Sequence, residues 1–131
     1  MGQRDAEEAD VNPESVQNLK IWQEGIEVVK DVYRLIKERP REELYGLVNQ
    51  ARRAAVSIPA NIAEGRGRGS PAEQARYGSI ALGSAYELQT LLHLALELEF
   101  SSKQYLEPLQ LKLYKLIKQI ASFVAVQEKR I

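Results

Sequence analysis

The chain has 131 residues, a formal net charge of zero and no cysteine. This length supports one domain with its own core, and the absence of cysteine excludes disulfides, thiol catalysis and thiolate metal sites. No apolar run reaches the roughly 20 residues that a membrane-spanning helix needs, so we expect a cytoplasmic protein without membrane contact.

The charges are unevenly distributed along the chain. Residues 1–18 carry a net charge of −4, whereas residues 19–131 carry +4. The first segment is polar and aperiodic, and Asn12-Pro13 interrupts it. We therefore expect a disordered acidic tail at 1–18 and a mildly basic folded domain at 19–131.

Two helices are predicted in the first half of that domain. The first runs from Leu19 to Arg39 and ends before Pro40. The second runs from about Glu42 to Gly65, where a glycine- and arginine-rich turn is expected to break it. Pro59 lies inside this second helix and is expected to kink or loosen one turn. The apolar stripe of the first helix is Leu19, Trp22, Ile26, Val29, Tyr33 and Ile36.

The third helix has the clearest start signal in the sequence. Ser70 is placed as N-cap, Pro71 as the first helical residue and Glu73 as the partner in a capping box. The helix should extend to about Glu99. It carries two apolar stripes, so at least two other helices must cover it.

The fourth helix is predicted from Ser101 or Ser102 to about Glu128, with an irregular first turn near Pro108. Short connections between long helices make neighbours antiparallel. The sequence therefore predicts an all-α fold, an antiparallel up-down-up-down four-helix bundle. Small residues on the second and third helices favour these two as the central pair.

No residue set points to catalysis. His93 is the only histidine, so neither a histidine-based triad nor a histidine metal site can be assembled in one chain. Glu64 and Glu87 lack the Glu-x-x-His spacing of a di-metal carboxylate site. We expect no enzyme activity, no metal and no cofactor.

One polar stripe of the second helix is a structural candidate. It includes Arg53, Ser57, Asn61 and Glu64, and we group Glu87 of the third helix with them. Such groups cost free energy when buried without partners. We expect a structural polar cluster, with the two glutamates paired to Arg53 or Arg52, rather than a ligand site.

Two basic features suggest contact with RNA or DNA. Arg66 and Arg68 precede the start of the third helix, where an anion is favoured, although a plain turn with solvated arginines is the alternative. Lys112, Lys115 and Lys118 form a basic face on the fourth helix that fits phosphates, or else simply a solvated face.

Four segments carry a specific pattern: Ile21-Trp22-Gln23, Pro40–Leu47, Gln50–Gly65, and Ile80–Ser84 with the following Glu87-Leu88. In these segments the chain resembles a bacterial four-helix-bundle family encoded in intervening sequences of 23S ribosomal RNA genes. The resemblance implies a barrel-shaped homopentamer. A related branch, the accessory proteins of diversity-generating retroelements, implies nucleic acid and a reverse transcriptase as further partners, but those proteins are strongly basic and this chain is not.

Overall fold

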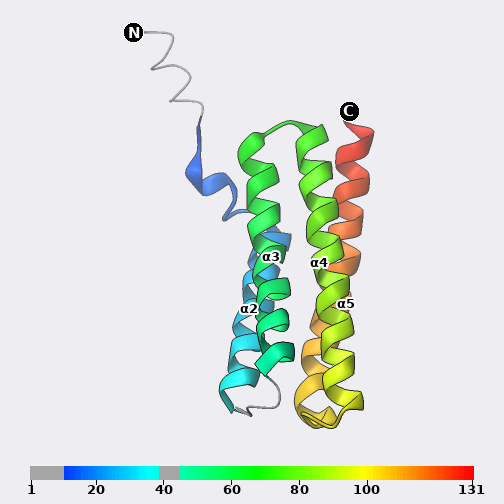
Figure 1. Cartoon of the computed structure of the whole chain (residues 1–131). Helices are drawn as coiled ribbons and strands as arrows, with labels where there is room; N and C mark the ends of the chain where they lie inside the picture. The colour runs from blue at the N-terminus through cyan, green and yellow to red at the C-terminus, as the bar shows by residue number, and fades with distance from the viewer. Residues whose placement is uncertain (1–10, 39–44) are drawn as a thin grey trace, which may run out of the picture.

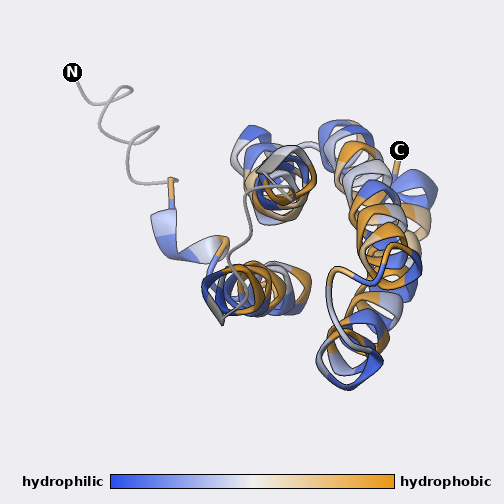
Figure 2. Cartoon of the chain, turned by 60° about the horizontal axis from the view of Figure 1, so that its bottom comes forward, coloured by the Kyte–Doolittle hydropathy of each residue, from blue (hydrophilic) through white to orange (hydrophobic). Residues whose placement is uncertain are grey.

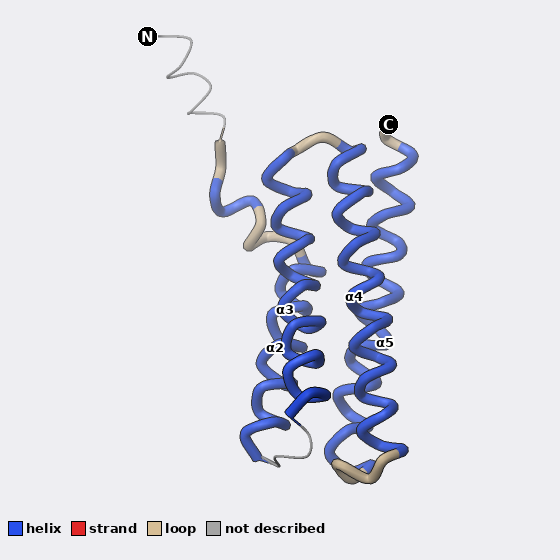
Figure 3. Tube along the Cα trace, in the orientation of Figure 1, coloured by secondary structure: helices blue, strands red, loops and turns tan. Residues whose placement is uncertain are grey.

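A computed structural model describes residues 11–38 and 45–131 of the chain. Four long helices form an antiparallel bundle, and no strand occurs in these two ranges (Figures 1 and 3). The predicted fold class is confirmed. The helices are α2 (Lys20–Glu38), α3 (Tyr45–Arg68), α4 (Pro71–Glu97) and α5 (Lys103–Lys129), preceded by the short 3-10 helix η1 (Pro13–Ser15).

Each helix packs against two neighbours. The contacting pairs are α2–α3, α3–α4, α4–α5 and α2–α5, so α3 and α5 lie across one diagonal of the bundle. The α3–α4 contact is the most extensive, as the small residues of these helices predict. Hydrophobic sides of the helices turn toward the interior (Figure 2). None of the helices in the described ranges has the length and apolar character to cross a membrane.

The buried side of α2 is displaced from the predicted stripe. Ile21, Val28 and Val32 are the buried side chains of this helix, whereas Trp22 and Val29 are only partly buried and pack at the edge of the core. Apolar residues occupy both adjacent stripes, so their spacing alone does not show which one faces the core.

Helix α3 is longer than predicted. It runs through the expected breaker and ends at Arg68, after which Gly69 adopts a left-handed backbone with φ of 86°. The reason is tertiary packing. A Cβ at Gly65 would lie 2.9 Å from Tyr77 Cβ and 3.2 Å from Gln74 Cα, so the absent side chain lets the end of α3 approach α4. This contact offsets the poor helix propensity of glycine.

Pro59 does not interrupt α3 either. It is buried, and a Cβ at Gly25 of α2 would lie 3.4 Å from Pro59 Cβ. The missing N–H of Pro59 removes the usual helical partner of the Ala55 carbonyl. The proline ring thus fills space beside Gly25 at the α2–α3 junction.

The N-cap and the first residue of α4 are as predicted, but the Glu73 side chain does not accept the return hydrogen bond that would complete the capping box. The Ser70 side chain accepts a hydrogen bond from the Glu73 backbone N–H at 3.1 Å, and Pro71 is the first helical residue. The helix ends at Glu97, two residues before the predicted end. Both α3 and α5 cover α4, which confirms that this helix needs two partners.

Helix α5 begins at Lys103 and contains Pro108. The apolar spacing of this helix predicts a seam of Leu106, Leu109, Leu113, Leu116, Ile120 and Phe123. The leucines and Ile120 are buried, and Phe123 is partly buried at the edge of the core. Ser102 is the N-cap residue, although its side chain makes no capping hydrogen bond.

The described part of the predicted tail contains one short helix. Asn12 caps η1 by accepting a hydrogen bond from the Glu14 backbone N–H, and no residue of η1 is buried. Residues 1–10 lie outside the described part of the chain, as do Glu42 and Glu43 at the predicted start of the second helix.

Candidate nucleic-acid interface

Arg66 and Arg68 occupy the last turn of α3 rather than a loop. Arg66 is half-buried and donates a hydrogen bond of 3.4 Å to the Gln74 side chain. Gln74 is buried and donates to the Gly69 carbonyl at 3.1 Å. Arg66 therefore helps to hold the α3–α4 turn, so it is neither a free phosphate contact nor a fully solvated arginine.

Arg68 is exposed, but its charge has local partners. Its Nε lies 3.2 Å from Glu64 Oε2, and its guanidinium lies 5.0 Å from the centre of the Tyr77 ring. Tyr77 and Glu64 raise the pKa of Arg68 above its already high value, so this side chain stays charged. Arg76, which the sequence reading missed, lies 5.3 Å from the same ring and 3.7 Å from Glu73.

The three predicted lysines of α5 divide into two groups. Lys112 Nζ lies 2.6 Å from Asp31 Oδ2, and the other oxygen of Asp31 accepts from Arg34 at 2.9 Å. Lys112 thus links α5 to α2 and is not a free cation, which is a correction. Lys115 and Lys118 are exposed and form no ion pair with a carboxylate in the described part of the chain.

An aromatic ring accompanies the second group. Lys118 Nζ lies 4.9 Å from the centre of the half-exposed Tyr114 ring. Such a contact leaves the ammonium charge available to a phosphate, because no opposite charge neutralises it. The outer side of α5 therefore combines cations with an accessible aromatic face.

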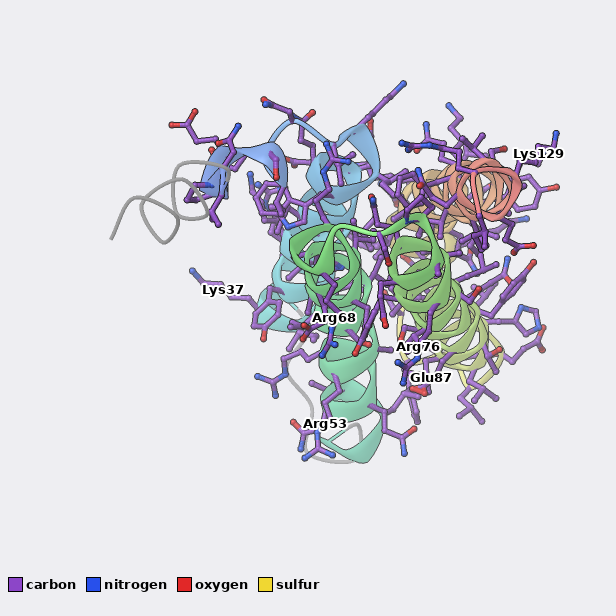
Figure 4. All side chains as sticks on the ribbon, turned by 90° about the horizontal axis from the view of Figure 1, so that it is seen from above. Lys37, Arg53, Arg68, Arg76, Glu87 and Lys129 are labelled. Atoms are coloured by element: carbon purple, nitrogen blue, oxygen red, sulfur yellow. The ribbon has the colours of Figure 1, made fainter. Side chains whose placement is uncertain are left out.

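The structure separates the arginines from the lysines. Arg66 and Arg68 belong to α3 and the lysines to α5, which lies diagonally across the bundle. Figure 4 shows Arg53, Arg68, Arg76 and Glu87 on one side of the molecule, away from α5. One copy of the chain therefore cannot present both groups to the same short stretch of phosphates.

The structural polar cluster is smaller than predicted. Ser57 Oγ and Ser84 Oγ form a hydrogen bond of 2.7 Å between α3 and α4. The Asn61 side-chain amide donates to the Ser57 carbonyl at 2.8 Å and to Ser57 Oγ at 2.9 Å. Ser84 is a member that the sequence reading missed, although it stands at helical spacing from Tyr77 and Leu88.

The three charged residues that were predicted for that cluster lie outside it. Arg53, Glu64 and Glu87 are exposed, and Glu64 pairs with Arg68 one turn along the same helix. Arg52 donates instead to Asn49 at 3.0 Å. The expected pairing of glutamates with Arg53 or Arg52 is wrong, because this stripe runs along the outer rim of the junction, where long charged side chains reach water.

His93 is exposed, with Nε2 3.5 Å from Glu97 Oε1. It lies at the rim of an open groove between α4 and α5 of about 520 Å³. No group of three or more His, Cys, Asp and Glu residues within 11–38 and 45–131 is arranged to hold a metal ion. The groove is lined by Gln89, Thr90, His93, Glu107, Gln110, Leu111 and Tyr114.

Comparison with known proteins places the chain in a family. A crystal structure of a protein with unknown function from the S23 ribosomal protein family of Bacteroides thetaiotaomicron VPI-5482 has the same fold, with a TM-score of 0.74 and 24% identity. The match covers 79% of this chain and 97% of that chain. None of the curated protein sequences matches. The family model of the 23S rRNA-intervening sequence protein matches residues 17–122, so the chain belongs to that family.

Proposed function

We propose that this protein is a non-catalytic, homo-oligomeric assembly protein that contacts RNA or DNA weakly through the outer side of α5. The observation that carries the proposal is the pair of exposed lysines, Lys115 and Lys118, without carboxylate partners among the described residues. Phosphate contact by such side chains releases counterions and gives an affinity that falls with salt.

The α3–α4 arginines take a secondary role in this proposal. Arg68 and Arg76 each lie beside a glutamate of their own helix, so phosphate must compete with a carboxylate that is already present. Lys103, Lys129 and Arg130 extend the basic side of α5 toward its two ends. This distribution favours α5 as the main surface for nucleic acid.

Self-association is the second part of the proposal. The bundle covers much of the surplus apolar surface by itself, since Ala85 and Leu92 are buried against their neighbours. Val56, Ile80 and Leu98 nevertheless remain 43%, 43% and 55% exposed. A second copy that covers these side chains would remove apolar surface from water. A closed ring, such as a pentamer, needs two different complementary surfaces on each copy.

Oligomerisation would also strengthen a weak basic surface. A ring presents the α5 lysines several times, and linked contacts raise the effective affinity for a long nucleic acid. The mild positive charge of each domain is then sufficient for binding to a long nucleic acid. No feature of the described residues points to a reverse transcriptase as partner. The main competing function is a protein-interaction scaffold that binds no nucleic acid.

The test is a binding titration of the full chain with structured RNA and with duplex DNA at two salt concentrations. We expect affinity to fall as salt rises. A Lys115→Gln/Lys118→Gln variant should weaken binding and reduce the slope of log K against log salt by about 1 to 2 units. The matched Arg68→Gln/Arg76→Gln variant should change both quantities less.

Three outcomes contradict the proposal. The absence of binding at low salt would leave the scaffold function standing. A monomer in sedimentation equilibrium at micromolar concentration would refute self-association. A larger loss in the arginine variant than in the lysine variant would move the interface from α5 to the α3–α4 side.

A further inference from the structure

The α4–α5 groove has features that phosphate binding alone does not require. Its volume of about 520 Å³ is in the range of small-molecule sites, but it is open along one side. Its lining combines two partly buried amides, Gln89 and Gln110, with Leu111 and Tyr114, which are 58% and 50% exposed. An amide offers both donors and acceptors, as the edge of a nucleobase does.

A second tyrosine extends this surface. Tyr86 precedes Gln89 and Thr90 by three and four residues, so it lies on the same face of α4 as these groove residues. Its ring is 52% exposed. Lys118 follows Tyr114 by four residues and continues the same face on α5.

The two tyrosines lie at nearly the same height in the bundle. Gly78 of α4 stands opposite Val124 of α5, since a Cβ at Gly78 would be 2.8 Å from Val124 Cγ2. Tyr86 is eight residues along α4 from that point, and Tyr114 is ten residues back along α5. In antiparallel helices this leaves an offset of only about 3 Å along the axis. Tyr114 lines the groove, and Tyr86 stands at the same height on the facing helix, one turn before the groove residues Gln89 and Thr90.

We propose that the α4–α5 groove binds unpaired bases of single-stranded nucleic acid, with Tyr86 and Tyr114 as stacking surfaces and Lys115 and Lys118 as phosphate contacts. This inference rests on the proposed function and names the form of nucleic acid that it recognises. Base stacking on aromatic rings needs bases that are not already stacked within a duplex. A splayed base fits into this concave surface. Reading the bases of a duplex would instead need a protruding element that enters a DNA groove.

The charges along the groove fit bases that stack on the tyrosines while the phosphates contact Lys115 and Lys118. Lys118 lies at the end that holds the tyrosines, and Lys115 lies beside it on the outer side of α5, where a phosphate backbone can pass. Glu107 and the His93–Glu97 pair lie at the other end. A carboxylate there repels phosphate but accepts a hydrogen bond from a base amino group.

The experiment compares a 12-nucleotide unstructured RNA with the duplex that contains the same strand, both titrated with the full chain at low salt. The groove variants are Tyr86→Leu and Tyr114→Leu. The matched control is Tyr105→Leu, because Tyr105 is also exposed, at 43%, but lines a different groove between α2 and α5. Circular dichroism confirms that each variant folds, and sedimentation velocity reports its assembly.

We expect the single strand to bind more tightly than the duplex. Each groove variant should weaken single-strand binding about fivefold to tenfold and leave duplex binding unchanged. The Tyr105→Leu control and the aromatic replacements Tyr86→Phe and Tyr114→Phe should retain the single-strand affinity.

Three results overturn this inference. Equal affinity for single strand and duplex, with no effect of the groove variants, would leave nucleic-acid binding in place without base stacking. Smaller assemblies formed by the groove variants would assign the groove to contact between copies. The absence of binding to either RNA would remove the proposed function and this inference together.

Discussion

The two helix hairpins that share α4 are built in different ways. In the α3–α4 hairpin, Gly65 brings the backbones together, Gly69 turns the chain and Ser70 caps the next helix. In the α4–α5 hairpin, the turn uses Glu99 with φ of 59°, and Ser102 makes no side-chain cap.

This difference shows how one bundle combines a closely packed junction with one that leaves an open groove. At the α3–α4 junction, Gly65 lets the helices pack closely, Gly69 and Ser70 form the turn, and Ser57 and Ser84 form a hydrogen bond between the helices. The α4–α5 pair depends on buried leucines, and its outer side stays open as a groove. The two hairpins therefore differ in turn chemistry and in how closely their outer sides are packed.

The largest expected effect is at Gly65. Gly65→Ala places a methyl group 2.9 Å from Tyr77 Cβ and 3.2 Å from the Glu73 carbonyl oxygen, and these atoms cannot move without moving α4. Overpacking should exceed the gain in helix propensity and lower the free energy of unfolding by about 2 kcal/mol. Urea unfolding at fixed protein concentration measures this change.

The control for that prediction is in the same helical turn. A Cβ at Gly67 meets nothing within 4 Å, so Gly67→Ala should raise the free energy of unfolding by about 0.5 kcal/mol. If both variants stabilise the protein, the two backbones are not in close contact at Gly65.

The next effect is at the glycine of the α4–α5 hairpin. Gly78→Ala places its methyl group 2.8 Å from Val124 Cγ2, an atom at the end of a side chain. The clash is therefore easier to relieve, and we expect a loss of about 1 kcal/mol. Val124→Ala should cost less in the Gly78→Ala background than in the natural sequence, which thermal unfolding of the double variant tests. Additive losses would contradict a direct clash.

The helix caps give a matched pair of smaller effects. Ser70→Ala removes the hydrogen bond from the Glu73 N–H and should lower the free energy of unfolding by about 1 kcal/mol. Ser102→Ala removes no such bond, so its effect should stay within about 0.5 kcal/mol. Equal losses in denaturant unfolding would show that the two helix starts are capped alike.

Much of the fold follows from local patterns in the sequence. The leucine spacing of α5 and the Ser70-Pro71 start of α4 predict those helices to within two residues. The end of α3 could not be predicted in this way, because glycine is a poor helix former and the packing of Gly65 against α4 is a tertiary effect.

The candidate surface was less predictable than the fold. Sequence spacing places Lys112, Lys115 and Lys118 on one helix, but only the packing of α2 against α5 shows that Asp31 neutralises the first of them. A local signal was available for Glu64, since Arg68 stands four residues away, at the spacing of helical ion pairs. The α4–α5 groove exists only once two distant segments are packed together.

The smallest expected effect is at the turn of the α4–α5 hairpin. Glu99 adopts the left-handed backbone that Gly69 supplies in the other hairpin, and the Phe100 N–H closes the turn on the Ala95 carbonyl at 2.8 Å. Glu99→Gly removes the steric cost of this conformation but gives the unfolded chain more freedom, so the net gain should be only about 0.5 kcal/mol. Glu99→Ala keeps the Cβ and should show no such gain. If both variants have the same midpoint of urea unfolding, the backbone at this position carries no strain, and the two hairpin turns differ in sequence but not in energy.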